Sequence, residues 1–403
     1  MNICFFTENS YKGGLDTFLI NLFNAWPDKE DELTLVCNDN HPGLETIVEK
    51  IVRPIKIKTY SRVFISKIVQ GNSQLNIIRK LFMLAFIVLQ YPILFPWYVI
   101  TLTLFFRKSF YDRLIVVNGG YPASLLCRCA AIAWRLSRKQ SLVIFNFHNS
   151  AVKPSWYFWV PEYFIDLAVL WSCSKLVSVS KNCLGSLNNR KAFRGCNKLY
   201  YIYNGIEDPA EKIEYIDCKE KIQQTGQKYC LMLATYEQRK GHTFLLQAFQ
   251  FVVKDFPDVV LKIYGYGKPI EKQIVADEVK RLSLENNVML NDFTPDTAFL
   301  IANASVIVVP SQEYESFGLT IIEAMAFGVP VVTTDVGGMP EVLSGSNAGF
   351  VCSKSDPETF GRTICKIFRD SSLATELSKN GRMVFEERFT ANKMAISYRD
   401  LIK

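Results

Sequence analysis

Metal-ligand and disulfide patterns are scarce in this chain. Its 403 residues contain only three histidines, and none of its eleven cysteines belongs to a CxxC pair. A zinc-organised domain and a disulfide scaffold are therefore excluded, and we interpret the cysteines as free thiols of a reducing compartment. The N-terminal stretch MNICFFTEN has no basic start and too short an apolar run for a signal peptide. These absences favour a cytoplasmic location.

Acidic side chains are missing from one long stretch. Residues 50–111 contain ten basic side chains and no acidic one, within a chain whose net charge is +7. Such segregation predicts an anionic partner, and a membrane surface, a phosphate-bearing lipid and nucleic acid are the candidates. No RNA- or DNA-binding motif accompanies the basic stretch, so we expect no nucleic-acid partner.

Charge of either sign is absent from residues 81–106. Their length would suffice to span a bilayer, which takes about 20 apolar residues. A single span, however, would place the strands predicted on either side of the run on opposite sides of the membrane. Pro92 and Pro96 are expected to break a single helix, and tyrosine and tryptophan suit a membrane interface. We therefore favour a monotopic hairpin or a pair of surface helices, with a buried soluble helix as the alternative.

Short apolar runs alternate with segments of helical period along most of the chain. The helical segments at 242–256 and 270–286 are examples. This alternation predicts an α/β fold of two doubly wound, Rossmann-like domains, each with a parallel sheet. The predicted strands are 3–7, 33–37, 114–118, 142–147 and 175–180, followed by 229–235, 259–265, 287–292, 304–311 and 329–335.

The domain boundaries follow from a change of composition in the middle of the chain. The acidic, proline-containing stretch 206–215 is typical of a linker. We expect domains at 1–205 and 206–385, with 386–403 forming a C-terminal helix that packs back on the first domain. The segment 50–111 would face a membrane.

Two glutamates lie eight positions apart in the stretch ESFGLTIIEAMAFGVPVV. Glu315 follows a predicted strand, and Gly318 allows a close backbone approach where a helix begins, whose free N–H groups favour an anion. For Glu315, helix capping is the alternative. Glu323 lies among apolar residues, where an unpaired carboxylate is unfavourable. Its oxygen atoms would suit a vicinal diol, such as that of a ribose.

Cations and glycines follow other predicted strands. Arg239 and Lys240 precede a predicted helix, where they would suit phosphate, although a solvated loop is the alternative. Gly265 belongs to a Gly-x-Gly after a strand, a pattern that also occurs in plain tight turns. In the first half, Gly13 and Gly14 open a helix after the first strand.

The order and spacing of these motifs resemble family 4 retaining glycosyltransferases of the GT-B fold. The resemblance spans nearly the whole chain, and its most specific part is the pair of glutamates followed by GG-x-PE. It is closest in kind to bacterial enzymes that build cell-envelope polysaccharide and lipopolysaccharide. The resemblance implies two Rossmann-like domains facing a cleft, a nucleotide-sugar donor in the second, an acceptor against the first, and no required metal.

The resemblance also implies roles for single residues. Three residues would be catalytic. Glu315 would bind hydroxyls of the donor sugar, Lys240 would hold the diphosphate, and His148 would lie near the transferred sugar. Arg239 would replace an arginine that many members carry at the position of Thr235. In the second domain, Glu323 would contact the ribose, and the donor would be contacted by Gly265 and by the backbone of Ser316, Phe317, Gly318 and Leu319. In the first domain, Gly13 and Gly14 would contact phosphate and acceptor. A hinge between the domains would be formed by Asn204, Gly205 and Ile206.

Several functional alternatives remain. An NAD-dependent oxidoreductase lacks its G-x-G-x-x-G signature here, whereas a sugar-nucleotide-binding scaffold and a nucleotide-sugar epimerase of the same fold stay open. We expect hexose transfer to a lipid-linked or cell-envelope glycan, without a cofactor, by a protein peripheral to the inner face of the cell membrane. UDP-glucose, UDP-N-acetylglucosamine, UDP-galactose and GDP-mannose are all candidate donors, with a UDP-sugar favoured over a GDP-sugar.

Overall fold

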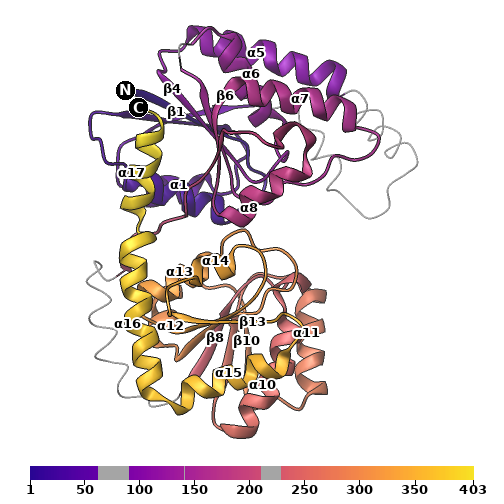
Figure 1. Ribbon diagram of the computed structural model, residues 1–403, viewed down its shortest axis with the longest axis vertical. Helices are drawn as coiled ribbons and strands as arrows, with labels where there is room; N and C mark the ends of the chain where they lie inside the picture. Colours follow the sequence, from indigo (N-terminus) through magenta and orange to yellow (C-terminus); the bar gives the residue numbers. More distant parts are fainter. Residues whose placement is uncertain (62–89, 140, 210–227) are drawn as a thin grey trace. The chain divides into compact units, whose positions relative to one another are not determined.

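The computed structural model describes residues 1–61, 90–139, 141–209 and 228–403. The chain forms two compact units. The first comprises residues 1–202 together with 395–403, and the second comprises residues 203–394. Each unit is built around its own parallel sheet (Figure 1).

Seven described strands form the sheet of the first unit, in the order β3-β2-β1-β4-β5-β6-β7, and all neighbours pair in parallel. The central strands are runs of buried aliphatic and aromatic residues, as expected for a sheet covered on both faces. The strands are β1 Asn2–Thr7, β2 Glu32–Asn38, β3 Lys56–Tyr60, β4 Arg113–Asn118, β5 Val143–Phe147, β6 Cys173–Ser178 and β7 Leu199–Tyr201.

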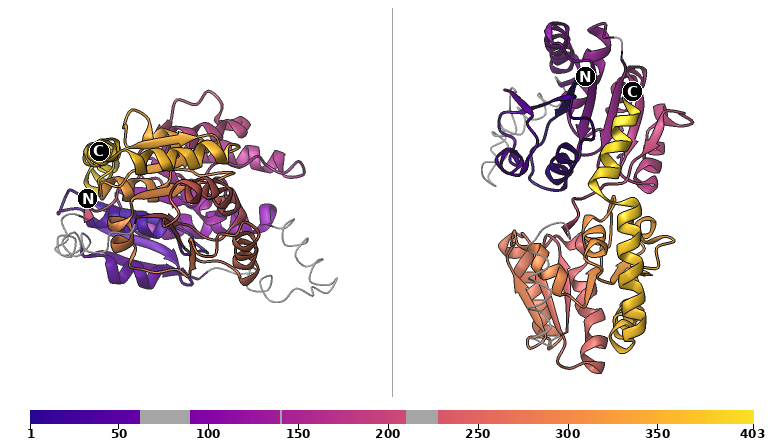
Figure 2. Two further views of the ribbon diagram at one scale, coloured as in Figure 1. Left: turned by 90° about the horizontal axis from the view of Figure 1, so that it is seen from below. Right: turned by 90° about the vertical axis from the view of Figure 1, so that its left-hand side faces the viewer.

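Helices cover both faces of this sheet. The helices α5, α6 and α7 lie on one face, and α1 and α8 lie on the other (Figures 1 and 2). The end of α17, whose Tyr398 hydroxyl accepts a hydrogen bond of 2.5 Å from Asn146 Nδ2, also packs in this unit. The helices are α1 Gly14–Asn24, α2 Leu44–Lys50, α5 Phe95–Lys108, α6 Leu125–Leu136, α7 Trp159–Ser172, α8 Lys181–Gly185 and α17 Ala391–Leu401.

Six described strands form the sheet of the second unit, in the order β10-β9-β8-β11-β12-β13, again all parallel. These are β8 Tyr229–Leu233, β9 Val260–Tyr264, β10 Val288–Asn291, β11 Val306–Val309, β12 Val331–Thr334 and β13 Gly349–Cys352. The helices are α10 His242–Asp255, α11 Pro269–Arg281, α12 Thr297–Asn303, α13 Leu319–Ala326, α14 Met339–Leu343, α15 Pro357–Arg369 and α16 Ser371–Arg388.

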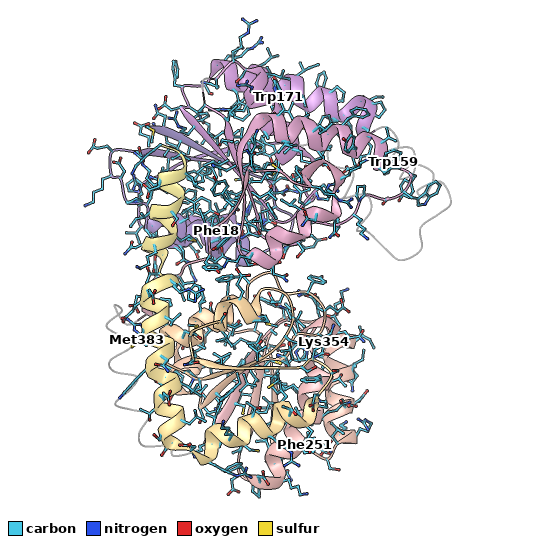
Figure 3. All side chains as sticks on the ribbon, in the orientation of Figure 1. Phe18, Trp159, Trp171, Phe251, Lys354 and Met383 are labelled. Atoms are coloured by element: carbon cyan, nitrogen blue, oxygen red, sulfur yellow. The ribbon has the colours of Figure 1, made fainter. Side chains whose placement is uncertain are left out.

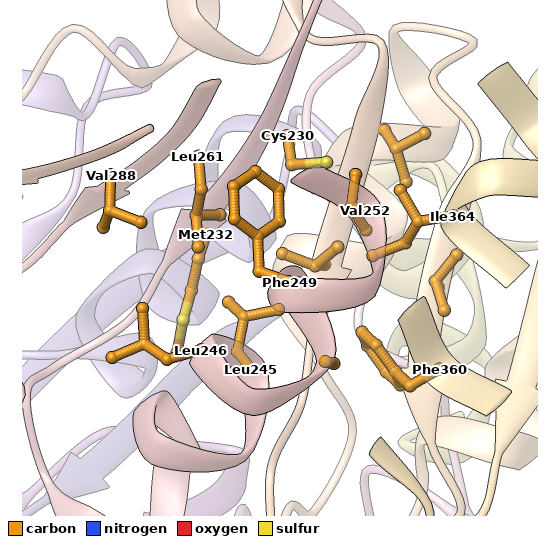
Figure 4. Packing of buried hydrophobic residues seen from close by; sticks show 14 of the residues in the cluster. Cys230, Met232, Leu245, Leu246, Phe249, Val252, Leu261, Val288, Phe360 and Ile364 are labelled. Atoms are coloured by element: carbon orange, nitrogen blue, oxygen red, sulfur yellow. The ribbon is translucent and has the colours of Figure 1, made fainter. Parts of the chain in front are cut away.

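The core of the second unit lies between the sheet and the helices α10 and α15. Phe249 of α10 packs among Cys230, Met232 and Leu261 of the strands, and Phe360 and Ile364 of α15 close the cluster (Figure 4). Gly361 permits this packing, because a Cβ atom there would lie 2.3 Å from the carbonyl oxygen of Ala248. The alternation of strand and helix predicted from the sequence is confirmed in both units.

Three strands were not predicted, and all three lie at a sheet edge. β3, β7 and β13 are the outer strands of their sheets. An edge strand is partly exposed, so its sequence need not be a continuous apolar run. KIKTY in β3 alternates lysine with other residues, and four of its five residues are exposed.

The helix predicted at 270–286 is shorter than expected. α11 ends at Arg281, because Ser283 takes a left-handed conformation with φ of 54° and the Leu284 amide turns back to the carbonyl of Val279. Leu282, Leu284 and Glu285 continue a helical pattern in the sequence without continuing the helix.

The uncharged run at 81–106 is described from residue 90 onward, and its first nine residues lie outside the described part. A short π-helical turn, Gln90–Leu94, leads into α5. Pro96 lies in the first turn of α5, where a missing N–H is harmless. The prolines therefore lie around the start of α5. Among the described helices, none is both long and apolar enough to cross a bilayer.

Candidate functional site

Two of the predicted catalytic residues meet at one edge of the second sheet. β8 and β11 are parallel neighbours, so the loops that follow them lie side by side. Lys240 is in the loop after β8 and Glu315 is in the loop after β11. Their Nζ and Oε2 atoms are 2.5 Å apart, and about one-fifth of each side chain is exposed. The fold thus brings together a cation and a carboxylate that are 75 residues apart.

A pair of glycines supports the Glu315 loop. The Gly338 amide donates a hydrogen bond of 2.8 Å to the carbonyl oxygen of Glu315. A Cβ atom on Gly337, whose φ is +60°, would lie 1.9 Å from the same oxygen. Only glycine fits there, so the GG-x-PE motif fixes the backbone that carries Glu315. The Ser311 hydroxyl lies 3.5 Å from the Glu315 carboxylate.

The Lys240 loop is fixed by the same kind of close approach. Gly241 has φ of +79°, and a Cβ atom there would lie 1.9 Å from the carbonyl oxygen of Pro310. The Gln312 amide donates to the carbonyl oxygen of Arg239 over 2.7 Å. The two loops are therefore locked to each other through their backbones, which holds Lys240 and Glu315 in place.

The Arg239 guanidinium is anchored beside the position where the sequence resemblance expects an arginine. Its Nε atom lies 2.6 Å from Glu237 Oε2, while the Thr235 hydroxyl donates to the other oxygen of Glu237 over 2.8 Å. The guanidinium also lies 4.7 Å from the centre of the Tyr314 ring. Glu237 thus links Arg239 to Thr235.

The helix α13 begins next to Glu315. Gly318 precedes it with φ of +94°, and Ser316 and Phe317 are buried. The Phe317 ring packs edge-on against Phe389 at 5.9 Å. The first amides of an α-helix lack intrahelical partners, so the start of α13 presents N–H groups beside the Lys240–Glu315 pair.

Glu323 occupies the second turn of α13. Its side chain is partly buried, and within the described residues it has no hydrogen-bond or ion-pair partner. Burial raises the pKa of its carboxyl group from an ordinary 4.5 to about 7. The folded state holds this proton more tightly than the unfolded chain. The contribution of protonated Glu323 to the free energy of unfolding is therefore complete below pH 4.5. It is lost as the pH rises through about 7.

Gly265 lies at the same edge, after β9. A Cβ atom there would lie 1.8 Å from the carbonyl oxygen of Ala234, so glycine is required for the approach of the two loops. The loops are joined by the Tyr236 amide, which donates to the Tyr266 carbonyl over 2.8 Å. His242 was not predicted as a site residue; it is buried and stacked on Tyr236 with ring centres 5.0 Å apart. A histidine at a helix start was its only sequence signal.

Gly13, Gly14 and His148 belong to the first unit, whereas the predicted hinge residues Asn204, Gly205 and Ile206 belong to the second. Gly13 is exposed and extended, with φ of 168°, and a Cβ atom there would meet nothing within 4 Å. Gly14 begins α1. Neither conformation nor packing requires a glycine at Gly13. His148 follows β5, and its ring lies 4.3 Å from that of Phe18. Burial lowers the pKa of His148 to about 3, so the imidazole is neutral at pH 7.

Among the described residues, no group of three or more histidine, cysteine, aspartate or glutamate side chains is arranged to hold a metal ion.

Comparison with known proteins agrees with this geometry. Residues 217–384 match the family described as Glycosyl transferases group 1. An uncharacterized glycosyltransferase of Haemophilus influenzae is 29% identical over 170 residues, which are 42% of this chain and 47% of that protein. The Escherichia coli O-antigen biosynthesis glycosyltransferase WclY is 27% identical over 305 residues, 72% of this chain and 78% of that protein. The chain spans about half the length of such curated relatives as the Haemophilus protein.

A solved structure shows the fold. The Anabaena protein Alr3699/HepE, in complex with UDP, matches with a TM-score of 0.75 and 19% identity over 100% of this chain and 99% of its own. The expected GT-B architecture of two Rossmann-like units is therefore confirmed. The second unit carries a glycosyl transferases group 1 domain. The narrower assignment to family 4 stays a prediction.

Proposed function

We propose that this protein is a retaining, metal-independent glycosyltransferase. It would move a hexose from a nucleotide-diphosphate sugar to a lipid-linked or other cell-envelope glycan. The observation that carries the proposal is the paired Lys240 and Glu315 beside the start of α13, with the unpartnered carboxylate of Glu323 one turn further along. A cation, free helix amides and two carboxylates are the groups that a diphosphate, a sugar and a ribose require.

Each group has a proposed place on the donor. Lys240 and the first amides of α13 hold the diphosphate, and Arg239 supplies the second cation. Glu323 accepts hydrogen bonds from the ribose diol, which satisfies a carboxylate that has no partner among the described residues. Glu315 accepts hydrogen bonds from hydroxyls of the sugar. When the diphosphate binds, Lys240 exchanges part of its contact with Glu315 for phosphate oxygens.

The proposed reaction replaces one bond at the anomeric carbon by another on the same face. The bond from that carbon to the diphosphate oxygen breaks as the bond to the acceptor oxygen forms. The acceptor proton passes to the departing diphosphate oxygen. Lys240 stabilises the charge that develops on this leaving group, which is the kind of fixed electrostatic assistance that lowers a barrier most. Neutral His148 contributes a hydrogen bond near the sugar, not a positive charge.

The glycine loop of the first unit supports the same proposal. Since Gly13 needs no glycine for its own conformation or packing, the missing side chain is better explained by a ligand that approaches the backbone. We assign this ligand to the donor phosphate or the acceptor. Gly14, the first residue of α1, completes the loop.

Donor class and acceptor class are proposals of the same kind. The UDP complex of the Anabaena protein favours a UDP-sugar over a GDP-sugar. WclY, an O-antigen biosynthesis glycosyltransferase, supports a cell-envelope glycan as acceptor. The basic side chains of residues 50–111 favour a peripheral position on the inner face of the cell membrane.

The configuration of the product tests the retaining assignment. We expect an α-linked product from an α-linked donor, because in the proposed reaction the departing diphosphate, rather than a carboxylate base on the opposite face, takes the acceptor proton. The measurement is proton NMR of the product formed on an alkyl glycoside acceptor, whose new glycosidic bond fixes the anomeric configuration. A β-linked product would rule out retention, while leaving the donor site itself intact.

A further inference from the structure

The helix α7 exposes apolar side chains and buries acidic ones, the reverse of an ordinary surface helix. Its exposed residues are all apolar: Trp159, Val160, Phe164, Leu167 and Trp171, with exposed fractions from 38% for Leu167 to 64% for Phe164. A surface helix of a globular protein normally turns polar residues outward. We call these five residues the α7 stripe. From Val160 to Trp171 they recur every three or four positions, which places them along one side of the helix.

The acidic residues of α7 point the other way. Glu162 and Asp166 are buried on the inner side of the helix, where Arg190 contacts both carboxylates and Arg128 contacts Glu162. The charges that would make an exposed helix soluble are therefore used inside. The apolar side of α7 is left exposed to solvent.

A second stripe runs along the neighbouring layer. Ile93, Trp97, Ile100 and Leu104 are exposed and follow the same spacing of four, three and four positions on the π-helical turn and α5. The helices α5, α6 and α7 share one face of the first sheet (Figures 1 and 2). In each helix the stripe lies opposite the buried residues, such as Val99 and Phe106 of α5. Trp159 and Trp171 mark the two ends of α7 (Figure 3).

The chain segment that carries the stripes is mostly basic. Residues 90–202 contain fourteen basic side chains and three acidic ones, which are Asp112, Glu162 and Asp166. Glu162 and Asp166 are buried in the ion pairs described above together with Arg128 and Arg190, so twelve basic side chains and Asp112 remain outside those pairs. Arg135 lies 5.2 Å from the Trp171 ring, and Arg107 and Lys108 end α5 and are exposed.

We propose that the α5 and α7 stripes form a docking surface for an anionic lipid bilayer. Tryptophan-rich apolar residues bordered by arginine and lysine match the boundary between acyl chains and negatively charged headgroups. α5 and α7 have fourteen residues each, fewer than the roughly 20 that a spanning helix needs, so both lie on the membrane. A second copy fits less well, because a two-fold interface would set the same basic residues against each other.

This surface assigns specific residues to the peripheral membrane location proposed above. The inference rests on that proposed location but does not depend on the donor site. The surface includes α7, which was not predicted from the sequence to contact a membrane, in addition to part of the apolar run at 81–106. Acceptor glycans carried on lipids would then reach the protein from the surface to which it is bound.

The test uses the full chain with vesicles that contain about one-third phosphatidylglycerol, at about 0.1 M salt, without nucleotide. The variant is Phe164→Ser combined with Trp171→Ser. Its matched control is Ile270→Ser combined with Ile274→Ser on α11, where the side chains are 64% and 57% exposed. We expect wild type and control to sediment with the vesicles and the α7 variant to bind at least about tenfold more weakly. Residues 62–89 are identical in all three chains.

Three results would overturn the proposal. They are a wild type that stays in the supernatant, an α7 variant that binds as tightly as the control, and a wild-type dimer in analytical ultracentrifugation that the α7 variant abolishes. Thermal stabilisation by a UDP-sugar, measured on each variant, keeps this test apart from the proposed activity. Unchanged stabilisation also shows that the second unit of the variant is folded, and tryptophan emission reports the first unit.

Discussion

Replacing Glu315 by glutamine is expected to lower the rate of glycosyl transfer by about 10²–10³-fold, which is the usual cost of removing one fixed electrostatic group from a catalytic site. The amide keeps the shape of the side chain but loses the charge that faces Lys240 at 2.5 Å. The fold should persist, because the ion pair is partly exposed and such pairs contribute only about 1 kcal/mol or less to stability. The measurement is release of the nucleoside diphosphate during transfer to an alkyl glycoside.

A matched control shows whether the lower rate is specific to Glu315 or follows from replacing a glutamate elsewhere in the same unit. Glu278 lies in the same unit, is 13% exposed and contacts Arg281 at 2.7 Å, but it belongs to α11, away from the loops that carry Lys240 and Glu315. Glu278→Gln should transfer sugar at the wild-type rate. If Glu315→Gln also stays within about threefold of wild type, Glu315 has no catalytic role.

Arg190→Ala is expected to destabilise the first unit by about 3–5 kcal/mol, the range found when one partner of a buried ion pair is removed. Arg190 is fully buried. Its Nε atom lies 2.7 Å from Asp166 Oδ2, and Nη2 contacts Glu162 and, at 3.0 Å, Asp166 Oδ1. Without the guanidinium, two buried carboxylates share the single charge of Arg128, and α7 loses its anchor.

The tryptophans make this prediction measurable. All six lie between residues 26 and 171, so tryptophan emission during a guanidinium titration follows the first unit alone. Arg194→Ala is the control, because within the described part of the chain that guanidinium donates only to the exposed carbonyl of Asn188, at 3.0 Å. If the alanine variant is too unstable to purify, Arg190→Lys should give an intermediate loss. A loss below about 1 kcal/mol for Arg190→Ala would contradict the account.

The architecture was predictable from the sequence because its central strands are continuous apolar runs. The three edge strands were not predicted, because edge strands are only partly buried and need not be continuous apolar runs. Their sequences are KIKTY in β3, LYY in β7 and GFVC in β13. Glu323 stood out for the opposite reason, since a carboxylate among apolar residues demands a partner. Lys240 and Glu315 were each predicted to follow a strand, although their direct contact was not predicted.

The buried charges and exposed aromatics of α7 were not predictable in the same way. WVPEYFIDLAVLWS contains apolar residues on both sides of the helix, and hydrophobic periodicity alone does not say which side meets the sheet. The choice is made by Arg128 and Arg190, which come from α6 and from the segment after α8 and which attract Glu162 and Asp166 inward. A long-range ion pair therefore decided what a local pattern left open.

Donor binding at Glu323 tests the central claim most directly. The measurement is thermal stabilisation of the wild type and of Glu323→Gln by UDP-glucose, UDP-N-acetylglucosamine, UDP-galactose and GDP-mannose at pH 6 and pH 8. One nucleotide sugar should stabilise the wild type by mass action. Its affinity should be up to about tenfold higher at pH 8, because burial raises the pKa of Glu323 to about 7 and the ribose diol donates to the ionised carboxylate. Glu323→Gln should bind more weakly and without this dependence on pH. Stabilisation of both proteins to the same extent at both pH values, or of neither by any donor, would contradict the proposed site.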